Sequence, residues 1–158
     1  MHGVDDPALR DAVRAYVKLM RATRAVQARV EPLLVREGLT LTQLGVLEAV
    51  LHKGPMTQRE LGRKVLTSPG NMTDVIDKLA ARGLVCRNRE GADRRQVQVS
   101  LTEAGAALIG DVFPRHAADI GRAMAGLDHA AITQLDDLLR RLGMAALTPP
   151  PCTDAPAT

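Results

Sequence analysis

Aromatic residues are almost absent from this chain of 158 residues. It has no tryptophan, and its aromatic content of 1% comes from Tyr16 and Phe113. Because 46% of the residues are nevertheless hydrophobic, the core must be built from Leu, Val, Ile, Ala and Met. The length fits one domain, or one domain with a dimerisation appendage.

Other absences exclude whole classes of protein. No apolar run approaches the roughly 18–20 residues of a membrane-spanning helix. The first residues, MHGVDDPALRD, are acidic and lack the apolar region of a signal peptide. Two cysteines, Cys86 and Cys152, do not make a disulfide framework, so a cytoplasmic protein is expected. The spacing of the histidines is not that of a metal site, and we expect neither a metal nor another cofactor.

Positive charge is concentrated in one part of the sequence. Residues 53–95 contain ten Lys or Arg and five Asp or Glu, a net charge of +5. The remaining residues contain eleven and thirteen, a net charge of −2, which gives +3 for the whole chain. Neutralising nucleic-acid phosphates requires such a basic excess, so residues 53–95 are the candidate interface with DNA. The alternative is a solvated surface on which the asymmetry arose by chance.

Two helix starts lie close together in this basic segment. Thr57 and Glu60 have the spacing of a capping box. Ser68 followed by Pro69 is typical of an N-cap and a first helical residue, and Gly83 is a typical stop for the second helix. The apolar face of that helix is predicted to consist of Met72, Val75, Ile76 and Leu79.

The opposite face of the second helix is polar, with short side chains near its N-terminus. A helix with such a face can enter a DNA major groove and reach the base edges. The predicted base contacts are Ser68, Gly70, Asn71, Thr73 and Asp74. The predicted phosphate contacts, which fix register without reading sequence, are Thr57, Gln58, Arg59, Lys64 and Lys78. For each of these residues, the alternative is an ordinary exposed polar position.

Two strand patterns follow, at residues 84–89 and 96–101, and the second alternates polar with apolar residues. The charged loop between them ends in Arg94 and Arg95. A hairpin directly after a recognition helix is the wing of a winged helix-turn-helix. A narrow minor groove concentrates negative potential that attracts arginine, so both arginines are candidates to enter it. Cys86, in the first strand, is interpreted as a small buried hydrophobic residue.

Helical patterns flank the basic segment on both sides. The first begins at Asp6 and Pro7, should kink or end at Pro32, and stops at Gly38. A helix of this length exposes more apolar surface than one small winged domain can cover, so pairing with a second chain is expected.

Further helices are expected after the first one. Thr40 and Gln43 have capping-box spacing and begin a strongly apolar helix, interpreted as the buried support of the domain. Beyond the hairpin, one helix should start at Thr102, and a last one should run from Asp128 to near Gly143. Residues 148–158 are proline-rich and expected to be disordered.

The chain resembles the MarR family of bacterial transcription regulators over roughly residues 39–116. The motifs that carry the resemblance are RGLV, DRR and LTEAG, with LTLTQLGVLEAVLHKGPMTQRELGRKV upstream. It implies a mainly α fold with a small β-hairpin wing: a dimerisation helix (1–38), a winged helix-turn-helix (39–101), C-terminal dimerisation helices (102–147) and the tail. In the family, the first and last helices interlock in a homodimer. A two-fold dimer places two recognition helices one turn of double-stranded DNA apart, roughly 34 Å, and implies a pseudo-palindromic operator.

The resemblance also implies roles for particular residues. In the family a wing arginine enters the minor groove and a nearby aspartate braces it, which here are Arg94 or Arg95 and Asp93. Small aromatic acids, phenols or quinones bind between the dimerisation helices and the winged domain and release DNA. The corresponding pocket would be lined by Tyr16, Met20, Leu47, His52, Phe113 and His116. For the two histidines, a surface position or a hydrogen-bonded partner is the alternative.

These observations together predict a ligand-relieved repressor that binds a pseudo-palindromic operator as a homodimer. Residues 39–55, with SPGNMT following, are similar to members that answer catechols and quinones. Redox-sensing members carry a cysteine in the first helix, and this chain has none there. The alternative function is a winged-helix dimer that binds protein instead of DNA. An enzyme is not expected, because no Ser-His-Asp order, glycine-rich phosphate loop or metal constellation is present.

Overall fold

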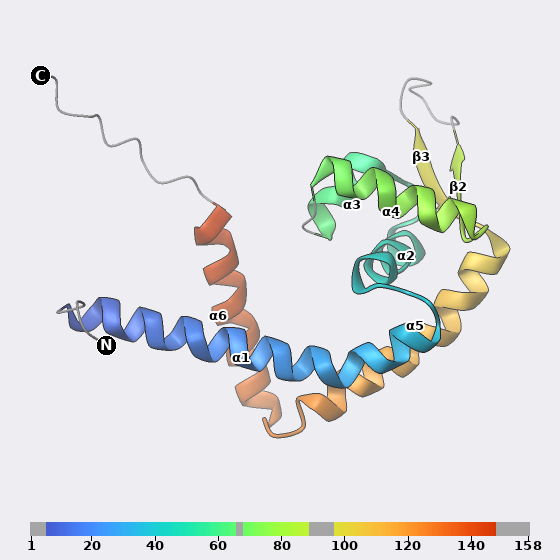
Figure 1. Ribbon diagram of the computed structural model, residues 1–158. Helices are drawn as coiled ribbons and strands as arrows, with labels where there is room; N and C mark the ends of the chain where they lie inside the picture. The colour runs from blue at the N-terminus through green and yellow to red at the C-terminus, as the bar shows by residue number, and fades with distance from the viewer. Residues whose placement is uncertain (1–5, 66–67, 89–96, 148–158) are drawn as a thin grey trace, which may run out of the picture. The chain divides into compact units, whose positions relative to one another are not determined.

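The computed structural model describes residues 6–65, 68–88 and 97–147 (Figure 1). The chain divides into two units, Met1–Ala123 and Met124–Thr158. The first unit contains α1 (Pro7–Arg36), α2 (Leu41–Lys53), β1 (Met56–Thr57), α3 (Gln58–Lys64), α4 (Pro69–Ala81), β2 (Val85–Asn88), β3 (Gln98–Leu101) and α5 (Glu103–Ala123). The second contains α6 (His129–Leu147). The predicted fold class, mainly helical with a small β-hairpin, is confirmed.

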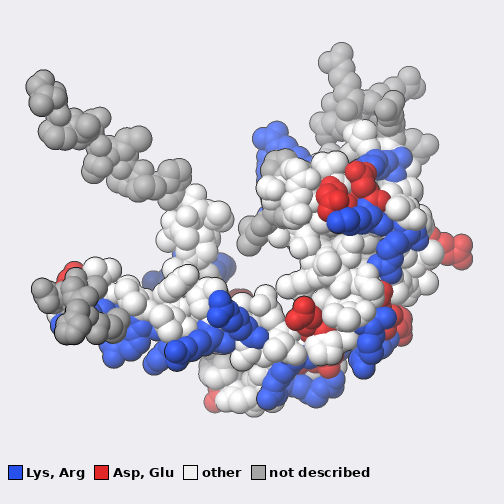
Figure 2. Space-filling view, in the orientation of Figure 1, with Lys and Arg blue, Asp and Glu red and all other residues white. Residues whose placement is uncertain are grey.

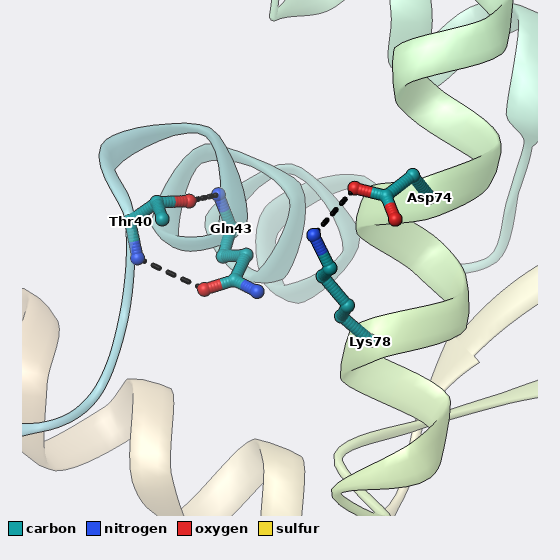
Figure 3. A network of polar contacts seen from close by, with 4 residues as sticks. All are labelled: Thr40, Gln43, Asp74 and Lys78. Atoms are coloured by element: carbon teal, nitrogen blue, oxygen red, sulfur yellow. Dashed lines mark hydrogen bonds and ion pairs between the residues drawn. The ribbon is translucent and has the colours of Figure 1, made fainter.

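Reciprocal capping boxes begin α2 and α3, as the sequence predicts. The Thr40 backbone N–H donates to the Gln43 side-chain oxygen at 2.9 Å, and the Gln43 backbone N–H donates to the Thr40 hydroxyl at 3.2 Å (Figure 3). At α3, the Thr57 amide donates to the Glu60 carboxylate at 2.8 Å. This bond, with that from the Thr57 hydroxyl, lowers the pKa of the Glu60 carboxyl below its ordinary value. The bonds that the Glu60 carboxylate accepts are therefore in place at neutral pH and weaken only as the pH falls through that lowered value.

One helix end and one strand differ from the sequence expectations. At Pro32, where a kink or an end was expected, the helix does not end: α1 continues to Arg36, because the last turns are held by Leu33 and Leu34, each 2% exposed. The expected end near Gly143 is wrong: α6 continues to Leu147. The residues after the glycine, Met-Ala-Ala-Leu, are strong helix formers and outweigh the roughly 1 kcal/mol that an interior glycine costs. The strand β1 was not predicted, because two residues carry no periodic pattern.

The core of the first unit surrounds α2, which Figure 1 shows between α4 and the pair α1–α5. Six residues of α2 are buried, which confirms its interpretation as the support helix. The largest fully buried side chains are aliphatic or Met: Leu44, Leu47, Leu61, Met72, Ile76, Leu79, Ile109, Val46, Val99 and Val112. Residues from α2, α3, α4, α5 and the sheet thus share one core, which fixes α4 against its neighbours.

The sheet has the order β1-β3-β2 and is antiparallel. Its register pairs Val85 with Leu101 and Asn88 with Gln98 across β2 and β3, as expected for the wing hairpin. Met56 pairs with Val99 and Thr57 with Gln98, which attaches the two residues before α3 to the hairpin. Cys86 is free and half-buried in β2, so it is less enclosed than the sequence suggested.

The helices α1 and α4 end in the same way. Each is followed by a glycine in the left-handed region, Gly38 with φ of 64° and Gly83 with φ of 67°. The amide of the next residue returns to the carbonyl five positions earlier, at 2.8 Å from Leu39 and 3.0 Å from Leu84. This is the Schellman arrangement, which satisfies carbonyls at the helix end. The predicted stops at both glycines are confirmed.

Gly105, in the first turn of α5, lies against the chain segment that leaves α4. A Cβ at this position would be 1.9 Å from the Leu84 carbonyl oxygen. We therefore expect Gly105→Ala to lower the free energy of unfolding by about 1–3 kcal/mol, the usual cost of overpacking. Urea denaturation followed by circular dichroism measures the change.

The matched control is Gly110→Ala in the same helix, where a Cβ would meet nothing within 4 Å. Here alanine should raise the free energy of unfolding by up to about 1 kcal/mol, because its helix propensity exceeds that of glycine. Equal effects of the two substitutions would contradict the close approach at Gly105.

The second unit is described by itself. The Asp128 carboxylate accepts a bond from the Ala131 amide at 2.8 Å and begins α6, as predicted. None of the 19 residues of α6 is buried, although Leu138, Leu139 and Leu142 follow one another at helical spacing. Among the described residues, no helix is long and apolar enough to cross a membrane.

Candidate nucleic-acid interface

The helix α4 has one buried face and one exposed face. Met72, Ile76 and Leu79 are each 0% exposed and Val75 is 6% exposed, so the predicted apolar face is confirmed as core. The Ser68 hydroxyl accepts a hydrogen bond from the Asn71 backbone N–H at 3.3 Å, so Ser68 is the N-cap of the helix. The exposed residues of this segment include all of the predicted base-contact positions: Ser68, Gly70, Asn71, Thr73 and Asp74.

Polar contacts orient two side chains of this exposed face. Gln58, at the start of α3, donates through its amide nitrogen to the hydroxyl of Thr73. Lys78 and Asp74, one turn apart, form an ion pair of 2.7 Å (Figure 3). The first contact joins α3 to α4, the two helices of the helix-turn-helix. The second balances the charge of the Asp74 carboxylate.

Basic residues are distributed more widely than the sequence count suggests. Figure 2 shows Lys and Arg over the part that contains α3 and α4 and also in a row along α1. On α3, Arg59, Arg63 and Lys64 are exposed. On the wing, Arg87 of β2 forms an ion pair of 2.6 Å with Asp77 of α4. Sequence reasoning missed this link, because its partners lie on different elements.

The tip of the wing lies outside the described residues, and with it Asp93, Arg94 and Arg95. The strands that lead to the tip are described up to Asn88 and from Val97. Asn88 donates to the Ser100 hydroxyl at 3.3 Å across the hairpin.

A pocket of about 590 Å³ lies between α2, the end of α3 and α5. It contains two of the predicted ligand residues, Phe113 and His116, and also Lys64. His116 is 5% exposed, and its buried Nδ1 has no hydrogen-bond partner within the described part of the chain. His52 packs edge-on against Phe113, with 5.3 Å between the ring centroids. An unsatisfied polar atom in a core costs free energy, so His116 is a candidate to bind a ligand through Nδ1.

The other predicted ligand residues lie elsewhere. Leu47 is 0% exposed and belongs to the core, whereas Tyr16 is 61% and Met20 is 38% exposed on α1. The structure thus places Phe113 and His116 in one pocket and His52 against Phe113. Among the described residues, no group of His, Cys, Asp or Glu is arranged to hold a metal ion.

Comparison with known proteins identifies the family. The model of the MarR family matches residues 37–96. The regulator MhqR of Bacillus subtilis (strain 168) is 32% identical over 135 residues, which cover 85% of this chain and 93% of MhqR. The chain belongs to the MarR family. It is a DNA-binding transcriptional regulator, and the family consists of regulators, not enzymes.

Solved structures agree with this assignment. AbsC, a MarR family transcriptional regulator from Streptomyces coelicolor, has a TM-score of 0.77 at 22% identity, covering 91% of this chain and 97% of AbsC. Bordetella bronchiseptica BpsR, whose DNA binding is regulated by 6-hydroxynicotinic acid, has a TM-score of 0.74 at 26% identity. That match covers 90% of this chain and 96% of BpsR. In this MarR protein, α3 and α4 are the helix-turn-helix and β2 with β3 forms the wing.

Proposed function

We propose that this MarR-family regulator binds a pseudo-palindromic operator as a homodimer, with one α4 in each of two successive major grooves. The observation that carries the proposal is the division of α4 into a fully buried apolar face and an exposed polar face. The core holds the helix rigidly, and a rigid scaffold is what precise base contacts require. The short side chains of Asn71 and Thr73 suit adenine and thymine edges.

The remaining contacts are proposed from position and charge. Thr57, Gln58 and Arg59 at the start of α3 contact phosphates, together with Lys64 and Lys78. Such contacts set register without reading bases. When Lys78 turns to a phosphate, it leaves Asp74, whose carboxylate is then free to accept a bond from a cytosine amino group. Arg94 or Arg95 enters the minor groove, braced by Asp93.

The dimer is proposed from two apolar surfaces. In α1 the buried residues begin at Val30, while Leu9, Tyr16, Val17 and Met20 are 38–61% exposed. In α6 no residue is buried, and Leu138 and Leu142 are 50% and 53% exposed. Apolar rows of this extent are normally covered by a partner. A second copy of the chain can cover both apolar rows, because a two-fold interface joins identical surfaces.

A small aromatic effector is proposed to occupy the pocket between α2, α3 and α5 and to relieve repression. Lys64 at this pocket suits a carboxylate or phenolate, and the unpartnered Nδ1 of His116 suits a hydroxyl. The effector must bind the DNA-incompetent state better, since equal affinity for both states would shift nothing. The regulation of BpsR by a hydroxylated aromatic acid supports this class. The resemblance to catechol- and quinone-responsive members favours a phenolic compound within it.

A gel shift on the DNA upstream of the protein's own gene tests the proposal. We expect one retarded species with two chains per operator, and an affinity that falls steeply as salt is raised from about 50 to 200 mM. Footprinting should reveal two half-sites about 10 base pairs apart. An affinity equal to that for unrelated DNA at every salt concentration would contradict specific binding.

His116 gives a prediction for the effector. His116→Leu removes the unpartnered nitrogen and should weaken release of the DNA by catechol or an aromatic hydroxy acid, raising the effector concentration at the release midpoint at least about tenfold. DNA affinity without effector should stay the same, and thermal stability should not fall, because an unsatisfied buried group is lost. Release midpoints in the gel shift measure the effect. His129→Leu, at an exposed histidine, is the control, and an unchanged response of the His116 variant would remove that residue from the site.

A further inference from the structure

The C-terminal end of α4 touches the C-terminal end of α1 through one side chain. Arg82 is the residue that follows α4. Its guanidinium donates to the Gly38 carbonyl at 2.5 Å and to the Glu37 carbonyl at 3.1 Å. These two carbonyls lie 44 and 45 residues away in the sequence. The two terminal nitrogens of a planar guanidinium donate in fixed, nearly parallel directions to two neighbouring acceptors, and a lysine ammonium lacks this rigid geometry.

The acceptors are suited to a cation. Glu37 is the C-cap of α1 and Gly38 follows it, so both carbonyls lie at the end of the helix that carries partial negative charge. The Glu37 side chain adds a contact to a third helix, because its carboxylate forms an ion pair of 3.1 Å with Arg115 of α5. The end of α1 is therefore held from α4 through its backbone and from α5 through a side chain.

The same end of α4 is also bound to the start of α5. The Thr102 hydroxyl donates to the Gly83 carbonyl at 2.6 Å, and the Thr102 amide donates to the Leu84 carbonyl at 3.1 Å. The absence of a side chain at Gly105 permits this approach. One end of α4 is thus fastened by polar contacts to both flanking helices, and the other end carries the proposed base contacts.

We propose that Arg82 is a positioning residue that sets the angle of α4 to α1 and so the distance between the two recognition helices of the dimer. The inference rests on the proposed binding of an operator by the homodimer. A helix of 13 residues is roughly 20 Å long. A tilt of about 10° at the Arg82 end therefore moves the DNA-reading end by about 3 Å, close to the rise of one base pair.

The test compares operators whose half-sites are moved apart or together by one base pair. Wild-type protein is measured first, and its failure to bind the native operator would refute the proposed function and not the role of Arg82. Arg82→Gln removes both the charge and the planar guanidinium, while Arg82→Lys keeps the charge and removes only the guanidinium. For both variants we expect affinity for the native operator to fall about three- to thirtyfold, the range of mutations that modulate coupling between sites. Affinity for the altered spacings should change little, so that discrimination between spacings is lost.

Two other roles of Arg82 would give different results. A phosphate contact would weaken all spacings equally, lower the salt dependence for Arg82→Gln, and leave Arg82→Lys close to wild type. A general loss of stability would also weaken all spacings equally. Arg36→Gln, in the last turn of α1, is the charge-matched control and should keep full discrimination. Wild-type discrimination between spacings in either Arg82 variant overturns the inference.

Discussion

Replacing Leu138 and Leu142 of α6 with glutamate should convert the regulator to monomers and abolish operator binding at concentrations that saturate the wild type. Both leucines are about half exposed, so the substitutions do not disturb a core within the chain. In the proposed dimer, they would place two charges of like sign on a buried two-fold surface, which is costly without partners. Linkage of two half-site contacts contributes a factor of about 10²–10⁴ to affinity, and a monomer loses it.

Light scattering after gel filtration measures the mass, and the gel shift measures binding. The control is Thr133→Glu with Arg140→Gln, which makes the same change in net charge at exposed positions on the side of α6 away from Leu138 and Leu142. The control should remain dimeric and bind DNA. A leucine double variant that stays dimeric with full affinity would show that α6 is not part of the interface.

Replacing Arg94 and Arg95 with alanine should weaken operator binding at least about thirtyfold and leave the dimer intact. Loss of one arginine that contacts DNA costs about 1–3 kcal/mol, and two such losses at the lower limit give that factor. The slope of affinity against salt should become shallower, because fewer counterions are released. Fluorescence anisotropy of labelled operator DNA at several salt concentrations measures both quantities.

The matched control removes the same charge elsewhere. Arg29 and Arg36 are exposed on α1, and their double replacement with alanine should change affinity far less than loss of the wing arginines. Equal affinity of the wing variant and the wild type would refute the wing assignment. Such a result would favour a winged-helix dimer that binds another protein.

Local motifs were predictable from the sequence because their partners are close in the chain. The caps at Thr40, Thr57 and Ser68 each involve a residue three positions later, and all are present. The apolar face of α4 follows from helical spacing alone. The polar residues opposite it could be chosen as candidates for the same reason.

Features that depend on distant partners were not predictable. The strand β1 exists because Met56 meets Val99, and the bonds from Arg82 to the end of α1 span more than 40 residues. The orphaned nitrogen of His116 follows from packing between three elements, which periodicity does not describe. For the same reason, the sequence grouped Leu47 with Phe113 and His116, although the structure places Leu47 in the core.

The scarcity of aromatic residues gives this protein an unusual optical property. Without tryptophan, its ultraviolet emission comes from Tyr16, which lies on α1, where the buried residues begin only at Val30. The intensity of tyrosine fluorescence should therefore change when two chains associate and change little when the winged core unfolds. A tryptophan introduced on α4 would be the sole fluorophore of its kind and could follow DNA binding without interference.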